Sequence, residues 1–204
     1  MIEPKKKRKW QPLCGAYKGR RAFLIGNGPS LNKTPLYLLE DEITLCFNRF
    51  DLMMERIGFI PTMYMAVDER VAEDNGDLIN GMAPDFKYVF VPDIHPSGMN
   101  FRNFIDDREN IYWLSLDWSG FYYDLPHTGL GGTVANVGLQ VLTYMGFSEI
   151  YLVGVDMDYV DHPTVIKHDQ RNWTSTRDDD PNHFDPRYYG KGKKYHYPRL
   201  QENM

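Results

Sequence analysis

Special residue types are concentrated in the segment Gly26-Asn27-Gly28-Pro29-Ser30. Gly26 and Gly28 carry no Cβ, so the backbone can turn tightly there and approach a ligand closely. Backbone N–H groups that open a helix favour an anion, and Ser30 stands where such amides would begin. The segment therefore predicts a turn that holds the phosphate of a nucleotide. The alternative is an ordinary tight turn between a strand and a helix.

The same turn differs from the dinucleotide fingerprint. That fingerprint needs a third glycine, and Leu31 stands in its place. A dinucleotide enzyme also carries Asp or Glu at the end of its second strand, where this chain has Asn48. A carboxamide both donates and accepts hydrogen bonds, so we expect Asn48 to face a ribose or a base. These residues favour a nucleotide other than NAD.

A second glycine cluster, Gly129-Leu130-Gly131-Gly132-Thr133, precedes the clearest helical pattern of the chain. Gly131 and Gly132 would deliver free amides to the start of that helix, and Thr133 can cap it. Two such clusters in one sheet suit a ligand with phosphate and sugar parts. The alternative is a flexible loop with a capping threonine.

Asp68 and Asp156 each follow an apolar run typical of a buried strand. A carboxylate at the end of such a strand can accept a hydrogen bond from a sugar hydroxyl, or hold Mg²⁺ through a nucleotide phosphate. A helix cap is the alternative for each.

The chain contains six histidines, none of them at a recognised zinc spacing. We therefore predict no metal site. Histidine titrates near neutral pH and could act as a general base, but spacing alone does not select one. The six are His95, His127, His162, His168, His183 and His196.

The elements that must position these residues alternate along the chain. Apolar runs predict strands over 21–25, 43–47, 62–67, 88–91, 111–116 and 150–155, the last of them buried. Helices are expected over 50–57 and 133–145, and Thr34-Pro35 is typical of a further helix start. This alternation predicts an α/β, Rossmann-like, doubly wound and mostly parallel sheet.

Three parts of the chain differ in character. Residues 1–20 form a basic segment that we interpret as a solvated tail, or as a peripheral contact with an anionic membrane, with Trp10 and Leu13 able to pack back onto the domain. Residues 21–157 form the nucleotide-binding core. Residues 158–204 are polar and lack a clear period, which is typical of a lid or acceptor-binding segment. Leu200 to Met204 resemble a helix start, so we expect the natural protein to continue.

Composition excludes several classes of protein. The 204 residues carry a net charge of −5, which argues against a general nucleic-acid binder. The sequence has no apolar run long enough to span a membrane and no signal-peptide pattern. Cys14 and Cys46 fit a reducing compartment, so we expect a cytoplasmic protein, peripheral to the inner face of the membrane if the basic segment binds there. Oligomeric state is left open.

Residues 23–31 and 46–50 resemble the opening of bacterial sialyltransferases that cap lipooligosaccharides. The resemblance resumes at Thr133, continues over 146–156, and returns near Asn182-His183-Phe184. Residues 61–69 and 182–192 are more similar to a broader family. It includes flagellin-glycosylating motility accessory factors and an archaeal 6-hydroxymethylpterin diphosphokinase.

The resemblance implies a Rossmann-like fold that binds a CMP-activated sugar without a metal. It implies that Asn27 and Asn48 contact the nucleotide and donor sugar, that Thr133 corresponds to the threonine opening the long helix, and that His183 is the general base. Tyrosines that help the phosphate leave would be Tyr159, Tyr188 and Tyr189. The chain departs from the sialyltransferases at Gly131-Gly132-Thr133-Val134, where their Arg-Ile-Thr-Ser stretch is lost, and in the whole acceptor-side sequence.

These observations predict an inverting glycosyltransferase. It would move a sialic-acid-like sugar from a CMP-sugar donor to a hydroxyl of a glycan or glycoprotein acceptor. One alternative is an ATP- and Mg²⁺-dependent pyrophosphokinase acting on a pterin-like alcohol, with Asp68 and Asp156 on the metal. The second alternative is a non-catalytic domain that binds a nucleotide sugar.

Overall fold

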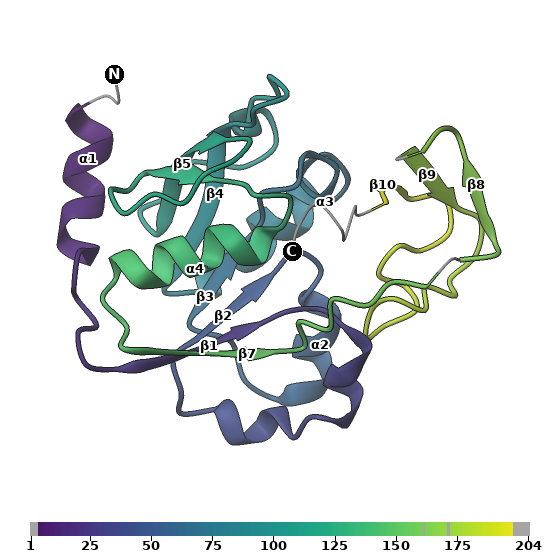
Figure 1. Cartoon of the computed structure of the whole chain (residues 1–204), viewed down its shortest axis with the longest axis horizontal. Helices are drawn as coiled ribbons and strands as arrows, with labels where there is room; N and C mark the ends of the chain where they lie inside the picture. The colour runs from purple at the N-terminus through teal and green to yellow at the C-terminus, as the bar shows by residue number, and fades with distance from the viewer. Residues whose placement is uncertain (1–3, 161, 171, 198–204) are drawn as a thin grey trace.

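The computed structural model describes residues 4–160, 162–170 and 172–197. Their main feature is a seven-stranded parallel sheet with helices packed on it, beside a separate three-stranded antiparallel sheet (Figure 1). The predicted α/β Rossmann-like fold is confirmed. The large sheet contains β1 (Arg21–Ile25), β2 (Thr44–Phe47), β3 (Met63–Met65), β4 (Tyr88–Ile94), β5 (Ile111–Asp117), β6 (His127–Gly129) and β7 (Glu149–Val153).

The helices are α1 (Pro4–Trp10), α2 (Asp51–Ile57), α3 (Glu69–Met82) and α4 (Val134–Tyr144). Short 3₁₀ helices cover Gln11–Leu13, Pro29–Lys33, Leu36–Leu39, Ala83–Asp85 and Phe101–Asn103. The small sheet consists of β8 (Val165–Lys167), β9 (Asn172–Ser175) and β10 (Lys194–His196).

Strand order in the large sheet is β6-β5-β4-β3-β2-β1-β7. The chain steps outward from β1 to β6 and then returns through α4 to pair β7 with the free side of β1. The order therefore reverses between β1 and β7. In open α/β sheets, such a reversal opens a crevice at the carboxyl ends of the strands.

Both faces of the sheet are covered by apolar side chains. Phe50, Met53 and Ile79 belong to the core on one face, and Val137 and Val141 of α4 belong to the core on the other. Helix α4 begins as predicted, because the Thr133 hydroxyl accepts from the Ala135 amide. It ends before Gly146, whose φ of 87° only glycine adopts readily.

The N-terminal segment packs onto the domain through Trp10 and Leu13, the two residues expected to do so. Trp10 is 1% exposed and stacks on Phe90 at 5.6 Å between ring centroids, while Leu13 and Tyr17 are also buried. The apolar side chains are therefore buried, while the neighbouring Lys7 stays exposed to solvent. Lys7 forms an ion pair with Asp124. Among the described residues, no helix has the length and apolar character needed to cross a bilayer.

Two further expectations about the elements were wrong. Thr34-Pro35 does not start an α-helix, because Thr34 ends a 3₁₀ helix and donates its hydroxyl to the Ser30 carbonyl at 3.0 Å. Strand β7 is not buried: Tyr151 is 45% exposed and Leu152 52% exposed. The physical reason is position, since β7 lies at the edge and pairs only with β1 within the described sheet.

The polar C-terminal part contains the small sheet and a loop over 178–191 that packs back onto the core. Phe184 and Tyr188 of this loop are buried in the core that surrounds Phe50. The Phe184 amide donates to the Asn27 carbonyl at 2.9 Å, so the loop rests on the turn after β1. Its role as a lid stays a prediction, and the expected helix start at 200–204 lies outside the described residues.

Candidate functional site

The turn after β1 needs its glycines because it packs tightly against the end of β7. A Cβ on Gly26 would lie 2.4 Å from the Gly154 carbonyl oxygen, and one on Gly28 would lie 2.3 Å from Asp156 Oδ2. The Ser30 amide donates to that carboxylate at 2.9 Å, and the Ser30 hydroxyl bonds to it as well. The carboxylate of Asp156 thus lies where the sequence predicts a phosphate.

This turn opens only a 3₁₀ helix, Pro29–Lys33, rather than an α-helix. Such a short helix offers fewer aligned amides than the α-helix start that the sequence predicted. Binding of a phosphate by the turn stays a prediction, and it would require the Asp156 carboxylate to move.

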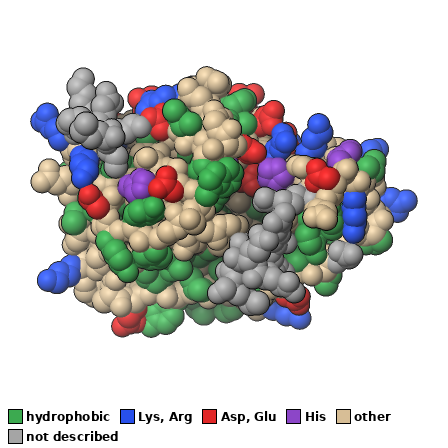
Figure 2. All heavy atoms as spheres, turned by 45° about the horizontal axis from the view of Figure 1, so that its top comes forward, with side chains coloured by type: hydrophobic (Ala, Val, Ile, Leu, Met, Phe, Trp, Pro, Cys, Tyr) green, Lys and Arg blue, Asp and Glu red, His purple; other side chains and the backbone are tan. Residues whose placement is uncertain are grey.

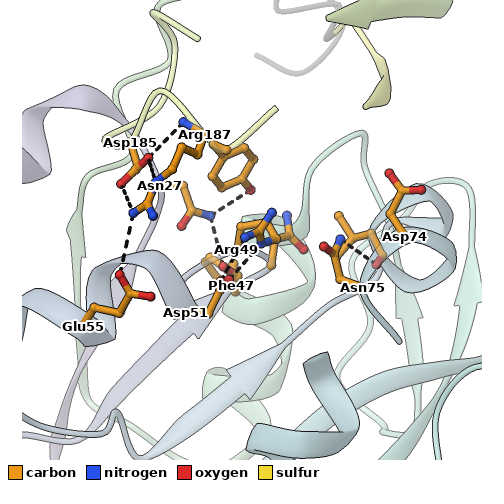
Figure 3. Close-up of polar contacts among 12 residues, drawn as sticks. Asn27, Phe47, Arg49, Asp51, Glu55, Asp74, Asn75, Asp185 and Arg187 are labelled. Carbon is orange, nitrogen blue, oxygen red and sulfur yellow. Dashed lines mark hydrogen bonds and ion pairs between the residues drawn. The ribbon is translucent and has the colours of Figure 1, made fainter. Parts of the chain in front are cut away.

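Asn27 and Asn48 come together at the carboxyl ends of β1 and β2. Asn27 Nδ2 donates to the Phe47 carbonyl at 3.2 Å and to the Tyr188 hydroxyl at 3.3 Å (Figure 3). The Oδ1 atoms of both asparagines are buried and have no hydrogen-bond partner in the described structure. Asn48 also has a φ of 51°, the left-handed region. Unpaired buried acceptors and backbone strain concentrate at ligand sites, so this pair is a candidate contact for a bound molecule.

His183 lies at the centre of a polar and aromatic cluster. Its Nδ1 bonds to Asp180 Oδ2 at 2.8 Å, and its Nε2 bonds to the Tyr159 hydroxyl at 3.1 Å. Its ring stacks on Tyr188 with centroids 3.7 Å apart, and Tyr189 packs edge-on. The structure therefore brings together all the residues proposed for catalysis from sequence: His183, Tyr159, Tyr188 and Tyr189.

Asp180, which the sequence reasoning missed, sets the orientation of His183. A carboxylate only accepts hydrogen bonds, so in the neutral imidazole Nδ1 carries the proton and Nε2 is left as an acceptor. Asp180 also accepts from the amides of Asn182 and Tyr189, at 2.9 and 3.2 Å, which fixes it in the loop. The spacing of Asp180 and His183, three residues apart, was the signal that could have found it.

Asn182 holds Tyr159 beside His183. Its carboxamide accepts from the Val160 amide at 2.8 Å and donates to the Val160 carbonyl at 3.0 Å. This two-point clamp joins the segment after β7 to the 178–191 loop. Burial raises the pKa of the Tyr159, Tyr188 and Tyr189 phenols, so all three stay protonated hydrogen-bond donors at neutral pH.

A cleft opens beside Tyr188 and Tyr189, at the carboxyl ends of β2 and β3. Its lining includes four basic side chains, Arg49, Arg70, Lys193 and Lys194, and two carboxylates, Asp68 and Asp74. Arg49 pairs with Asp51 at 2.9 Å (Figure 3). Lys193 pairs with Asp74 at 3.3 Å. The sequence reasoning did not single out these cations, which the fold gathers from three separate segments.

Asp68 also lines this cleft, but it serves as the N-cap of α3 and accepts from the Arg70 amide at 2.7 Å. The Asp156 carboxylate instead bonds Ser30 on the turn after β1, so the two carboxylates have separate partners. In the described residues, no group of three or more His, Cys, Asp and Glu side chains could hold a metal.

The second glycine cluster is not joined to the His183 cluster by any hydrogen bond among the described residues. Gly131 and Gly132 have φ of 56° and 78°, as a turn requires, and the Gly131 amide donates to the Trp118 carbonyl. Thr133 caps α4. These residues make the loop that leads into α4, and their contact with a ligand stays a prediction.

The structure defines a Rossmann-like α/β protein, and sequence comparison identifies its family. The model of the 6-hydroxymethylpterin diphosphokinase MptE-like family matches residues 3–162. The chain therefore belongs to the MptE-like family, as the resemblance predicted. No curated protein matches the sequence.

A solved structure with a similar fold is that of the MAf glycosyltransferase from Magnetospirillum magneticum AMB-1. The TM-score is 0.51 at 14% sequence identity, over 97% of this chain and 33% of that chain. This protein thus spans about a third of the length of the MAf glycosyltransferase chain. At this identity, the likeness establishes the fold.

Proposed function

We propose that this protein is an inverting glycosyltransferase that moves a sialic-acid-like sugar from a CMP-activated donor to a hydroxyl of a glycan or protein. The observation that carries the proposal is the hydrogen-bonded series Asp180–His183–Tyr159 beside a cleft lined with basic side chains. A nucleotide-sugar transferase needs these two features, a base for the acceptor hydroxyl and positive charge for the leaving phosphate.

In the proposed reaction, the acceptor hydroxyl lies where the Tyr159 hydroxyl now bonds to His183 Nε2. Its oxygen forms a bond to the anomeric carbon while the bond from that carbon to the phosphate oxygen breaks. The proton passes to Nε2, and the bonding electron pair leaves with CMP. Asp180 stabilises the imidazolium that forms. Arg49, Arg70 and the protonated tyrosines stabilise the charge on the departing phosphate.

Asn27 and Asn48 support a nucleotide at the same edge of the sheet. Their unpaired Oδ1 atoms are hydrogen-bond acceptors, so a ligand would have to supply donors, such as ribose hydroxyls or the exocyclic amino group of a base. Tyr188 lies between these oxygens and the cleft, because it bonds Asn27 and also lines the cleft. A ligand that reached both asparagines would replace the Tyr188 contact.

A thermal-shift panel of nucleotides with and without Mg²⁺ tests the ligand class. CMP at a hundred times its dissociation constant should add about 2.7 kcal/mol, or roughly 5–11 °C in a domain of this size. His183→Ala should then lower turnover about 10²–10⁴-fold with CMP affinity unchanged. His127→Ala is the control, because His127 pairs with Asp117 away from the cluster. Loss of turnover in the control alone would move the base to His127.

The family match favours one second candidate, an ATP- and Mg²⁺-dependent pyrophosphokinase. The basic cleft would suit a triphosphate, and Asp68 at its wall could meet a metal bound to the phosphates. Stabilisation by ATP with Mg²⁺ but not by CMP would favour this reaction. Nucleotide binding with no turnover on any acceptor would favour a binding domain.

A further inference from the structure

A second hollow lies between the start of α3 and the small sheet. Its lining comes from Arg70, His168, Asn172, Trp173, Lys194 and Tyr195. Figure 2 shows lysine, arginine and histidine side chains gathered on the right-hand lobe, where Figure 1 places β8 and β9. The small sheet lies beyond residue 162, where the family match ends. The hollow is therefore lined by one residue of the matched range, Arg70, and by residues that follow that range.

The hollow carries fixed positive charge and no carboxylate in its lining. Lys194 forms no ion pair with any residue that the structure describes. Arg70 bonds Glu73 through one guanidinium nitrogen at 3.0 Å, which leaves further N–H groups of its fork for a ligand. The first cleft, in contrast, contains Asp68 and Asp74 among its lining residues. The second hollow is thus the more strongly selective of the two for an anion.

Trp173 adds an unmet donor to this lining. Its side chain is buried, with the residue 4% exposed, and its Nε1–H has no hydrogen-bond partner in the described part of the chain. One ring face stacks on Tyr197 at 4.0 Å, and the Lys167 ammonium lies 4.2 Å from the ring centroid. The indole N–H only donates, so a ligand that satisfies it must present an acceptor atom.

The hollow adjoins the proposed catalytic cleft. Arg70, Lys194 and Tyr195 line both, and Tyr195 stacks on Tyr189 at 4.1 Å. Tyr189 in turn packs on His183. A sugar held in the second hollow could thus extend along these rings toward the proposed base.

We propose that this second hollow binds the anionic group, a carboxylate or a phosphate ester, of an acidic acceptor glycan. The unpaired indole N–H of Trp173, the two permanent cations Arg70 and Lys194, and the absence of a lining carboxylate favour an anion. The proposal rests on the proposed function only in assigning the bound anion to the acceptor. Anion binding itself requires no nucleotide, so the two can fail separately.

The test follows the indole N–H signals of the ¹⁵N-labelled full chain by NMR, without nucleotide. Trp173→Phe assigns the Trp173 signal, and the Trp113 signal, whose N–H donates to Asp107 at 2.8 Å, is the internal control. The probes are methyl β-glucuronide for a carboxylate, glucose 6-phosphate for a phosphate, and methyl β-glucoside as the neutral sugar. We expect at least one acidic sugar, and not the neutral one, to shift the Trp173 signal.

Lys194→Gln and Arg70→Gln should each weaken acidic-sugar binding about tenfold, because each removes a charge-assisted hydrogen bond. Lys191→Gln is the matched control, since Lys191 is an exposed lysine of the adjacent loop that does not line the hollow. An equal response to the neutral sugar, no Trp173 shift with any probe, or equal affinity in all three variants would overturn the proposal. Competition between CMP and the acidic sugar for the Trp173 signal would assign the hollow to the donor instead. Failure of CMP to bind, with acidic sugars still shifting Trp173, would refute the proposed donor alone.

Discussion

Asp180→Asn is the substitution that separates the proposed base from a merely structural histidine. Asp180 Oδ2 accepts from His183 Nδ1 and from the Tyr189 amide, and its Oδ1 accepts from the Asn182 amide. Asparagine has the same shape but replaces one oxygen by an NH₂ group. Whichever oxygen is lost, one of the two backbone amides then faces a donor instead of an acceptor.

The magnitude follows from that single unmet donor. A buried N–H without a partner costs about 1–3 kcal/mol, so the melting temperature should fall by about 2–12 °C. Turnover should fall further, by about 10²–10⁴-fold. With NH₂ at the Oδ2 position, His183 must accept at Nδ1, and its proton moves to Nε2, where a base needs a lone pair. With NH₂ at the Oδ1 position, the orientation of His183 survives, but the charge that stabilises the imidazolium is gone.

The assay compares Asp180→Asn with Asp178→Asn, by melting temperature, CMP affinity and transfer rate. Asp178 lies in the same loop, and its Oδ1 accepts from the Lys191 amide at 2.6 Å, so its substitution perturbs the loop without touching His183. We expect CMP affinity to be equal in the two variants and turnover to collapse only in Asp180→Asn. A lower melting temperature with a normal transfer rate would refute the proposed role of the Asp180–His183 pair.

Three other predictions concern stability and binding. Burial lowers the pKa of His95 below its ordinary 6.5, so as the pH falls the unfolded chain takes up a proton before the folded chain does. The free energy of unfolding should therefore be highest above about pH 6.5 and decrease below it, and melting temperatures measured against pH should lose this dependence in His95→Gln. Asn48→Gly places glycine at a left-handed backbone position that glycine adopts without strain, so the free energy of unfolding measured with denaturant should change by no more than about 1 kcal/mol. The affinity for CMP should nevertheless fall, and an unchanged affinity would count against contact between Asn48 and the nucleotide. Gly28→Ala should destabilise the fold because its Cβ would meet Asp156, whereas Gly81→Ala, with open space around it in α3, should stabilise it by about 0.4–1 kcal/mol in the same measurement.

The large sheet was predictable because its strands are nearly continuous apolar runs. β2 and β3 are buried on both faces, and β1 is buried except at Arg21 and, in part, Phe23. The apolar runs over 21–25, 43–47 and 62–67 indicated this burial. Helix α4 was predictable for a similar reason, since one apolar stripe, a capping threonine and a terminal glycine all agree. Local signals suffice where local and tertiary preferences coincide.

Helix α3 was missed because its sequence contains Gly76, Gly81 and several acidic residues, which dilute the apolar stripe. Tertiary packing compensates: a Cβ on Gly76 would lie 2.9 Å from the Phe104 carbonyl, so this glycine permits close approach of a neighbouring segment. The small sheet was missed because its strands are only three or four residues long, and because β10 pairs with β9 across the long loop that separates them in the chain. No short-range pattern reports such pairing.

The grouping of His183 with Tyr159, Tyr188 and Tyr189 came from resemblance, and the structure supplies its physical basis. Asn182 clamps Val160, and Asp180 orients the imidazole. The Asn182–Val160 contacts could not be read from the sequence, because they depend on how two separate segments pack together. The Asp180–His183 contact is local, and only the three-residue spacing of the pair points to it. The resemblance located the residue types, while the loop packing determines what each atom can do.

Charge distinguishes the two places at which the proposed phosphate could bind. At the turn after β1, Ser30 already binds the Asp156 carboxylate, and a second anion about 4 Å from it would be repelled by about 4 kcal/mol at an effective dielectric constant near 20. In the cleft at the ends of β2 and β3, the four cations Arg49, Arg70, Lys193 and Lys194 outnumber the two carboxylates, Asp68 and Asp74. With Asp156 in place, electrostatics therefore favour the cleft over the glycine turn. On this view, the turn after β1 contributes to the site through Asn27, whose backbone and carboxamide join the core to the loop that carries His183.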